Sequence, residues 1–288
     1  MGTDTRTGSG DGTGAAAGPP DVDALLERAR ETLDRERPRT ADERDAFADL
    51  HDRLRAVRPV SARPSGPVAG GPVASVADAT TDAAADRLAA VREAYRETVM
   101  AVPHFDAEYG ESYAESVTEE FGPAIAAPLV GGDRFDDRYR RALLEAAEEG
   151  RSRRATLVDA LDAERESLAT HRERIREIRE RVAAVDVGGK SGRAPAGAAT
   201  DGANVTASFG ALSAARSTLA ALEERCDTVA ADRQADVHEH AHRLSLSVET
   251  VDVPTYCYGP LPVSYPVLSA VTAVGERVER HRRARVGE

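Results

Sequence analysis

Apolar side chains recur every three or four residues along most of this chain, which is the spacing of one face of an α-helix. The pattern is clearest from Leu157 onward, where apolar residues keep a seven-residue repeat that is typical of coiled coils. We therefore expect an all-α protein, whose longest helix spans residues 134–185.

A second helix with the same repeat is predicted for residues 208–244. The segment between the two helices, residues 186–204, is rich in Gly and Ala and is predicted to be a flexible loop. Two long helices joined by one flexible loop can bury their apolar stripes against each other. The fold expected here is a long antiparallel helical hairpin, coiled-coil-like in its packing.

The apolar positions that we expect to carry the contacts of this hairpin and of a partner are Leu161, Leu168, Ile175, Ile178, Leu219 and Leu222. Polar residues interrupt the two stripes at Glu164, His171 and Arg233. Such interruptions set the register or the choice of partner, at some cost in stability.

A smaller aromatic-rich helical core, on which the hairpin packs, is predicted between residues 102 and 129. Four of the twelve aromatic residues of the chain fall in this segment, at Phe105, Tyr109, Tyr113 and Phe121. Their spacing places them near one helical stripe.

The chain before this core is predicted to form separate segments. Residues 1–20 are rich in Gly, Thr and Ala and are predicted to be a disordered leader. An accessory pair of helices is predicted for residues 21–58, and a Pro- and Gly-rich linker for residues 59–75. The main helical domain is expected to span residues 76–288.

Each helix of the accessory pair has its own start signal. Asp21 is placed to cap the first helix, and Thr40 followed by Glu43 matches a capping box for the second. Both helices have narrow apolar stripes, so we expect them to be solvated attachments to the main domain.

The charged residues indicate the setting of the protein. The chain has 37 arginines but one lysine, Lys190, and its formal net charge is −12. Excess carboxylates paired with arginine suit a protein in molar salt, which predicts a cytoplasmic protein of a halophilic archaeon. Salt at that level weakens binding to phosphate backbones, and the net charge opposes it, so we expect no nucleic-acid partner.

Several short motifs together resemble a haloarchaeal family of uncharacterised helical proteins, over roughly residues 75–285. The motifs are Val102-Pro103-His104-Phe105 through Tyr109-Gly110-Glu111, Glu120-Phe121-Gly122-Pro123, Arg233-Gln234, Tyr256-Cys257-Tyr258 and Tyr265-Pro266-Val267-Leu268. The resemblance implies a helical, halophile-restricted domain of unknown function and supplies no catalytic residues.

One acidic segment is a candidate metal site. It contains His104, Asp106, Glu108 and Glu111 within eight residues, and imidazole with carboxylates suits zinc, manganese or iron. The alternative is that these acids stabilise the first turn of a helix, which the helix dipole favours.

Three alternating histidines form a second candidate. On a helix, His238 and His242 lie four residues apart and can share one metal ion, whereas Glu239 is spaced to join His242 but points away from His238. Because the neighbouring residues are mostly Ala, Asp and Arg, surface histidines are the competing interpretation.

Nucleophilic chemistry has little support in the sequence. Cys226 falls on the apolar stripe of its helix and is expected to be a buried thiol, whereas Cys257 is the better exposed candidate. The chain contains no Walker loop, dinucleotide-binding glycine motif, serine-hydrolase elbow or HExxH motif. We therefore expect no cofactor, and the balance favours a protein without enzymatic activity.

These observations favour a non-enzymatic helical interaction or scaffold protein that binds a protein partner or itself. A metal-binding protein or metal-dependent enzyme that uses the segment from His104 to Glu111 is the alternative. Peripheral membrane contact through the basic last helix is less favoured, because salt weakens attraction to anionic headgroups.

Overall fold

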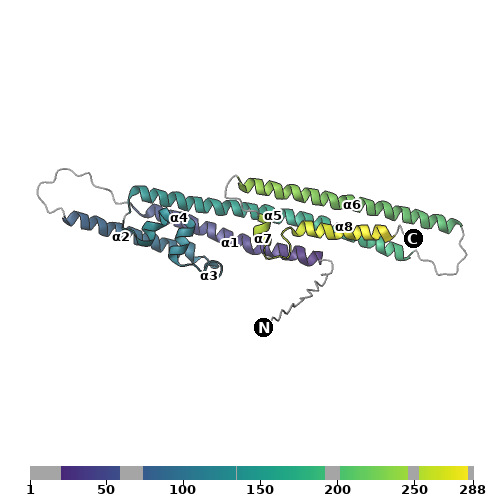
Figure 1. Cartoon of the computed structure of the whole chain (residues 1–288), viewed down its shortest axis with the longest axis horizontal. Coiled ribbons are helices and arrows are strands. Elements are labelled where there is room, and N and C mark those ends of the chain that lie inside the picture. Colours follow the sequence, from purple (N-terminus) through teal and green to yellow (C-terminus); the bar gives the residue numbers. More distant parts are fainter. Residues whose placement is uncertain (1–20, 59–73, 134, 192–201, 246–252, 285–288) are drawn as a thin grey trace, which may run out of the picture. The chain divides into compact units, whose positions relative to one another are not determined.

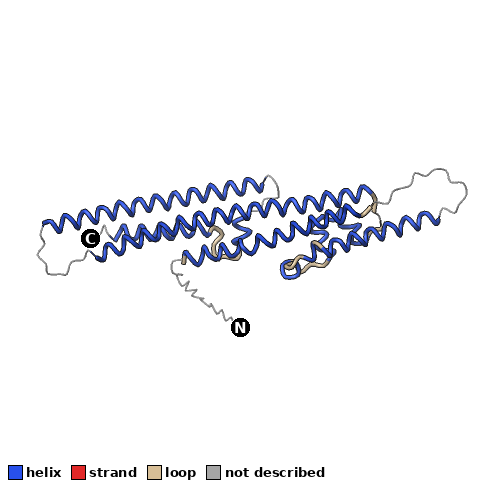
Figure 2. Tube along the Cα trace, turned by 180° about the vertical axis from the view of Figure 1, so that it is seen from behind, coloured by secondary structure: helices blue, strands red, loops and turns tan. Residues whose placement is uncertain are grey.

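The computed structural model describes residues 21–58, 74–133, 135–191, 202–245 and 253–284. Within these ranges every regular element is helical (Figure 2), which confirms the predicted all-α fold class. The predicted leader, residues 1–20, lies outside the described residues.

The elements follow one another along the chain as labelled in Figure 1. They are α1 (Val22–Ala56), α2 (Ala74–Glu97), the 3-10 turn η1 (Val99–Ala101), α3 (Phe105–Glu108), α4 (Tyr113–Gly131), α5 (Asp137–Ser191), α6 (Gly202–Ser245), α7 (Val253–Tyr258) and α8 (Pro266–Ala284). They form two compact units, which we call terminal and central. Of the described residues, the terminal unit contains those up to Ala29, those within His171–Arg233 and those from Tyr265 onward. The central unit contains those within Arg30–Thr170 and Gln234–Ser264.

The terminal unit packs segments of α1, α5, α6 and α8 around an apolar interior. On α5, Ile175 and Ile178 are buried, as are Leu219 and Leu222 on α6. Arg174 on α5 donates to Asp232 on α6 at 2.5 Å. Further along α5, Ile178 lines a shallow hollow with Val229, which lies earlier on α6 than Asp232. Since the contacts move forward on α5 and backward on α6, these segments run antiparallel. The predicted burial of the hairpin stripes is thus confirmed in this unit.

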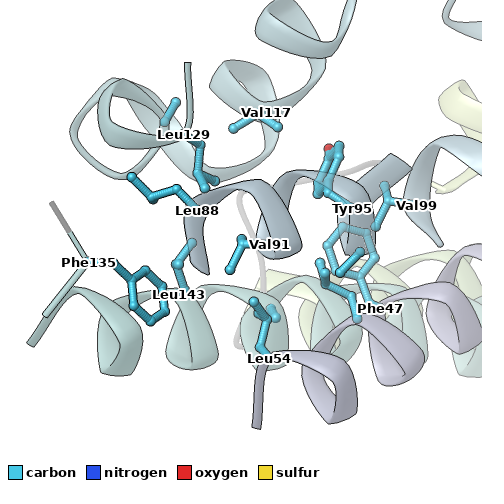
Figure 3. Packing of buried hydrophobic residues seen from close by; sticks show 14 of the residues in the cluster. Phe47, Leu54, Leu88, Val91, Tyr95, Val99, Val117, Leu129, Phe135 and Leu143 are labelled. Atoms are coloured by element: carbon cyan, nitrogen blue, oxygen red, sulfur yellow. The ribbon is translucent and has the colours of Figure 1, made fainter. Parts of the chain in front are cut away.

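The core of the central unit collects side chains from α1, α2, α4 and α5 (Figure 3). Phe47, Leu88 and Tyr95 are almost fully buried there, together with Leu129 and Leu143. Each such side chain contributes about 1.5–3 kcal/mol by its removal from water, so this cluster is the main source of stability of the unit.

Aromatic rings meet at one end of this core. Tyr95 lies edge-on to Phe121, with ring centroids 5.6 Å apart, and edge-on to Tyr113 at 5.8 Å. Phe47 completes the group at 6.4 Å from Phe121. A Cβ on Gly150 of α5 would lie 2.8 Å from the Phe47 ring, so glycine at this position allows α1 and α5 to approach.

The accessory helical pair predicted for residues 21–58 is wrong in two respects. A single helix, α1, runs through Pro38, and its Phe47 is part of the core of the central unit. Thr40 does not begin a second helix, because it lies inside α1, where its hydroxyl donates to the carbonyl of Glu36 at 3.1 Å. A proline inside a helix costs about 3 kcal/mol, and burial of apolar side chains on both sides of it offsets that cost.

The predicted loop boundaries also shift. Helix α2 begins at Ala74, inside the predicted linker of residues 59–75, whose first fifteen residues lie outside the described ranges. Helix α5 continues to Ser191 and α6 begins at Gly202, so both helices extend into the predicted loop. Extending an existing helix by one residue costs far less than starting one, which favours such extensions at helix ends.

Helix ends in the central unit are fixed by side chains. Ser112 and Glu115 form a capping box at the start of α4. At its end, Arg92 of α2 donates to the carbonyl of Leu129 at 2.7 Å. Arg140 of α5 likewise donates to the carbonyl of Val57, just beyond α1, at 2.7 Å. Arginines near the last turns satisfy carbonyls that have no partner within the helix.

Candidate functional site

A network of charged and polar side chains lies beside the aromatic end of the central core. Its common acceptor is Glu43 on α1. The Nε2 atom of His104 lies 3.0 Å from its Oε1 atom, and the hydroxyl of Tyr109 donates to the same oxygen at 2.9 Å. Arg154 of α5 donates from Nε to the Oε2 atom at 3.2 Å. Three separate segments of the chain therefore meet at one carboxylate.

Arg154 also joins Glu43 to a second carboxylate, Glu120 of α4. Its two terminal nitrogens donate to the two oxygens of Glu120 at 2.7 and 2.8 Å, which is the bidentate geometry of strong arginine–carboxylate pairs. Arg153 donates to Glu120 at 2.5 Å. The guanidinium of Arg154 lies 4.5 Å from the ring centroid of Phe47, within range for a cation–π interaction.

The network perturbs the ionisation of its members. Burial disfavours the charged form of Glu120, but hydrogen bonds and charges from Arg154 and Arg153 outweigh this effect and lower the pKa of its carboxyl. Burial would also lower the pKa of the Arg154 guanidinium, yet Glu120 and Glu43 raise it above its ordinary value. Partial burial and the nearby Glu43 raise the pKa of the Tyr109 phenol. The Glu120 carboxylate and the Arg154 guanidinium, whose pKa values move apart in this way, are therefore held ionised around neutral pH, whereas the raised pKa of Tyr109 keeps its phenol neutral.

A cavity of about 210 Å³ opens next to this network. Its apolar wall includes Phe47, Tyr95 and Phe105, and its polar wall includes Glu43, Tyr109, Glu111, Ser116, Glu119, Glu120 and Arg154. Mixed apolar and polar walls of this kind are typical of small-molecule sites.

The structure separates the four residues of the predicted acidic metal site. His104 is 7% exposed and lies against Glu43, with the Oε2 atom of Glu108 4.0 Å away. Glu108 also pairs with Arg39 at 3.4 Å. Asp106 is exposed, and Glu111 lies at the cavity. Across the described residues, no three His, Cys, Asp or Glu side chains converge in a way that would hold a metal ion.

Of the predicted histidine pair on α6, the structure describes only the side chain of His238. His238 is exposed, and the side chain of His242 lies outside the described residues. The inward residue is His240, whose Nδ1 atom lies 3.4 Å from the Oε2 atom of Glu164. Tyr258 of α7 donates to the other oxygen of Glu164 at 2.7 Å, so the buried carboxylate in the α5 stripe joins α7 to α5.

The two cysteines are both buried, so the expectation that Cys257 is exposed is wrong. Packing of α7 leaves this residue 2% exposed. Burial and neighbouring carboxylates raise the pKa of the Cys257 thiol to about 12 and that of Cys226 to about 11. Neither thiol is suited to act as a nucleophile, because the reactive form is the thiolate.

Sequence reasoning missed most of the network. The spacing of Glu43 from Thr40 predicts a capping box instead of a tertiary role. Arg154 is one of 37 arginines and lies in a regular helical pattern, with no local feature to distinguish it. A sequence signal did exist at His104, Tyr109 and Glu120, since all three fall within the motifs that carry the family resemblance.

Fold and site together define an all-helical protein with a buried ion network beside a small cavity. No helix in the described ranges combines the length and apolar character needed to cross a membrane. The chain belongs to the family described as Domain of unknown function (DUF7260), whose model matches residues 24–282. The match begins well before residue 75, which agrees with the place of α1 in the core. No curated protein and no solved structure matches the chain.

Proposed function

We propose that this protein is a non-enzymatic helical interaction or scaffold protein. The observation that carries the proposal is an uncovered apolar face on the second half of α4. The polar side chains around Glu43 and Arg154 pair with one another. The outer side of the second half of α4, in contrast, has no polar side chain. It is therefore better suited to contact another apolar surface than to bind or convert a polar substrate.

The apolar face follows a change in the character of α4. The helix breaks at Gly122, whose φ of 74° is readily adopted by glycine, and Pro123 starts the second segment. From Pro123 to Gly131 there is no polar side chain, although 31% of the whole chain is charged. A helix that is apolar all round is normally buried on every side.

Only one side of this segment is covered by the central unit. Ala126 and Leu129 are buried in the core, whereas Ala124, Ala127 and Val130 face outward, and Val130 is 50% exposed. The outward residues are spaced by three, so they line one helical face. We define these three outward residues as the α4 face.

The predicted interaction residues of the hairpin play a different part. Leu161, Leu168, Ile175, Ile178, Leu219 and Leu222 are all at most 2% exposed. They pack within the units of this chain, so in this fold they stabilise the protein and are not accessible to a partner. The α4 face is the surface that we assign to the partner.

We further propose that the protein works in the cytoplasm of a halophilic archaeon. The excess of carboxylates over arginines and the near absence of lysine support this setting. Molar salt screens attraction between exposed charges, so recognition there would depend on apolar contact. Salts that are excluded from protein surfaces strengthen such contact.

The test is capture of partners from a haloarchaeal extract in molar KCl, combined with sedimentation analysis of the purified protein. The variant A127R/V130D replaces two residues of the α4 face with charges. Ser152→Asp, at an exposed position of α5, is the matched control. We expect the wild type and the control to retain one near-stoichiometric partner, or to dimerise, and the double variant to lose this association. An association that is unchanged in the double variant, or a wild-type monomer that binds nothing, would show that the proposal is wrong.

A further inference from the structure

The cavity beside the ion network has chemistry that favours one class of ligand. We propose that it binds a small organic cation, in which an ammonium or guanidinium group is carried on a short alkyl chain. This inference is independent of the α4 face and of any protein partner.

The charges of the cavity wall leave a negative excess. Four carboxylates line the cavity, those of Glu43, Glu111, Glu119 and Glu120, against the single guanidinium of Arg154. Arg153 adds one further positive charge at Glu120. The wall therefore carries more negative than positive charge, and an anionic ligand would be repelled.

Two of the four carboxylates are available to a ligand. Glu43 and Glu120 already accept hydrogen bonds from Arg154 and its neighbours. Glu111 and Glu119 form no hydrogen bond or ion pair with any residue that the structure describes. These two carboxylates at the cavity are therefore free to accept hydrogen bonds from a ligand.

The apolar wall also suits a cation with an alkyl chain. Phe47, Tyr95 and Phe105 line the cavity, and aromatic rings attract cations within about 6 Å of their centroids. Arg154 over the Phe47 ring shows that this wall already accepts a guanidinium. Val99 and Val102 complete an apolar surface against which methylene groups can pack.

The size of the cavity limits the ligand. Its volume of about 210 Å³ is below the range of about 300–1,000 Å³ that is usual for sites of drug-sized ligands. A short diamine or a small alkyl guanidine suits a cavity of this size. A cation of this length can meet a carboxylate of Glu111 or Glu119 while its chain lies against the apolar wall.

The probes for the test are putrescine and agmatine, with butanediol as the neutral analogue and succinate as the anionic one. Binding to the full chain is measured by calorimetry and by saturation-transfer NMR, over a series of KCl concentrations at which circular dichroism shows the protein to be folded. We expect both cations to bind and both analogues to fail. The affinity should fall as KCl rises, because Glu111 and Glu119 lie near the solvent.

Three variants locate the site. E111Q/E119Q removes both available charges and should weaken binding at least about tenfold, since a hydrogen bond to a charged group contributes roughly 1.5–3 kcal/mol. Val102→Phe keeps the charges but fills the cavity, and should abolish binding. Glu145→Gln is the control, since this exposed carboxylate lies about 14 Å along α5 from Arg154 and should leave the affinity unchanged.

Three results would overturn the proposal. The first is a folded wild type that binds neither cation at any KCl concentration. The second is butanediol binding as tightly as putrescine, which would show that the carboxylates do not select the ligand. The third is unchanged binding in both E111Q/E119Q and Val102→Phe, which would place any bound amine elsewhere on this acidic protein.

Discussion

Replacing Arg154 with methionine tests whether the buried ion network stabilises the central unit. Methionine keeps most of the aliphatic volume but leaves Glu43 and Glu120 without their shared cation. The side chain of Arg154 is 19% exposed and that of Glu120 is 13% exposed, so both charges are largely removed from water. Removing one partner of a buried ion pair typically costs 3–5 kcal/mol.

The expected cost is lower here, because other donors stay in place. Arg153 still pairs with Glu120, and Tyr109 still donates to Glu43. We therefore expect Arg154→Met to lower the free energy of unfolding by about 2–3 kcal/mol. The assay is urea unfolding followed by circular dichroism, since urea, unlike guanidinium chloride, leaves the ionic strength unchanged.

The matched control is Arg176→Met in the terminal unit. Arg176 pairs with Glu173 and Glu180 on the same helix and is about half exposed, so its loss should change the free energy of unfolding far less than the loss of Arg154. Added KCl should reduce the effect of the control further but leave most of the effect of Arg154→Met, because salt screens buried pairs weakly. If Arg154→Met unfolds within about 0.5 kcal/mol of the wild type, the network does not stabilise the fold and our reasoning is wrong.

Three further predictions concern acid, thiol chemistry and the core. The pKa of Glu120 is lowered in the folded state, so its stabilising effect is complete above the unfolded pKa of about 4.3 and is lost as the pH falls through the folded value. Urea midpoints from about pH 6 down to about pH 3 should therefore fall less steeply for Glu120→Gln than for the wild type, and parallel curves would contradict this. Burial raises the pKa of Cys226 to about 11 and that of Cys257 to about 12. Mass spectrometry at pH 8 should therefore show alkylation by iodoacetamide only after denaturation. Rapid labelling of the folded protein would show that these thiols are not buried. Leu88→Ala should lower the free energy of unfolding of the central unit by about 2–5 kcal/mol, because Leu88 is fully buried. Ile175→Asp should abolish helical packing in the terminal unit, because it places a charge in the apolar interior. An unchanged urea midpoint for the first variant, or unchanged helicity for the second, would show that the position is not part of the core.

The sequence predicts the helical stripes well because their period is a local property. Residues spaced by three and four on α5 lie on one face of any α-helix, whatever it packs against. Leu161, Leu168, Ile175 and Ile178 are all buried as that spacing requires. Polar residues in the stripe follow the same rule, since Glu164 is fully buried where the heptad places it.

The capping boxes show where local pattern fails. Thr40 with Glu43 has the same spacing as Ser112 with Glu115, yet only the second pair caps a helix. The first pair lies in the middle of α1, and its glutamate bonds to residues 61, 66 and 111 positions away. A four-residue pattern contains no information about partners at such distances, so tertiary contacts decided the outcome.

The candidate cavity was beyond sequence prediction for a similar reason. Its walls come from α1, α2, α4, α5 and the segment around α3, and their approach depends on long-range packing. Gly150 is an example, since glycine inside a helix is unfavourable by itself and is explained only by the Phe47 ring against it. The aromatic residues expected to mark a core do so in part: Phe105 is buried, whereas Tyr109 is 44% exposed and lies against Glu43.

The ion network also fixes the position of α1 along its own axis. It distinguishes the observed register of α1 from registers that are shifted by one helical turn. The apolar stripe of α1 repeats with each turn, so a slip of one turn, about 5.4 Å, would still bury many of its apolar side chains. Such a slip would bring Arg39 or Phe47 to the place of Glu43. Either a second cation or an aromatic ring would then face Arg154, and three hydrogen bonds to Glu43 would be lost. Apolar burial holds α1 against the unit, and the charges select its position along the helix axis.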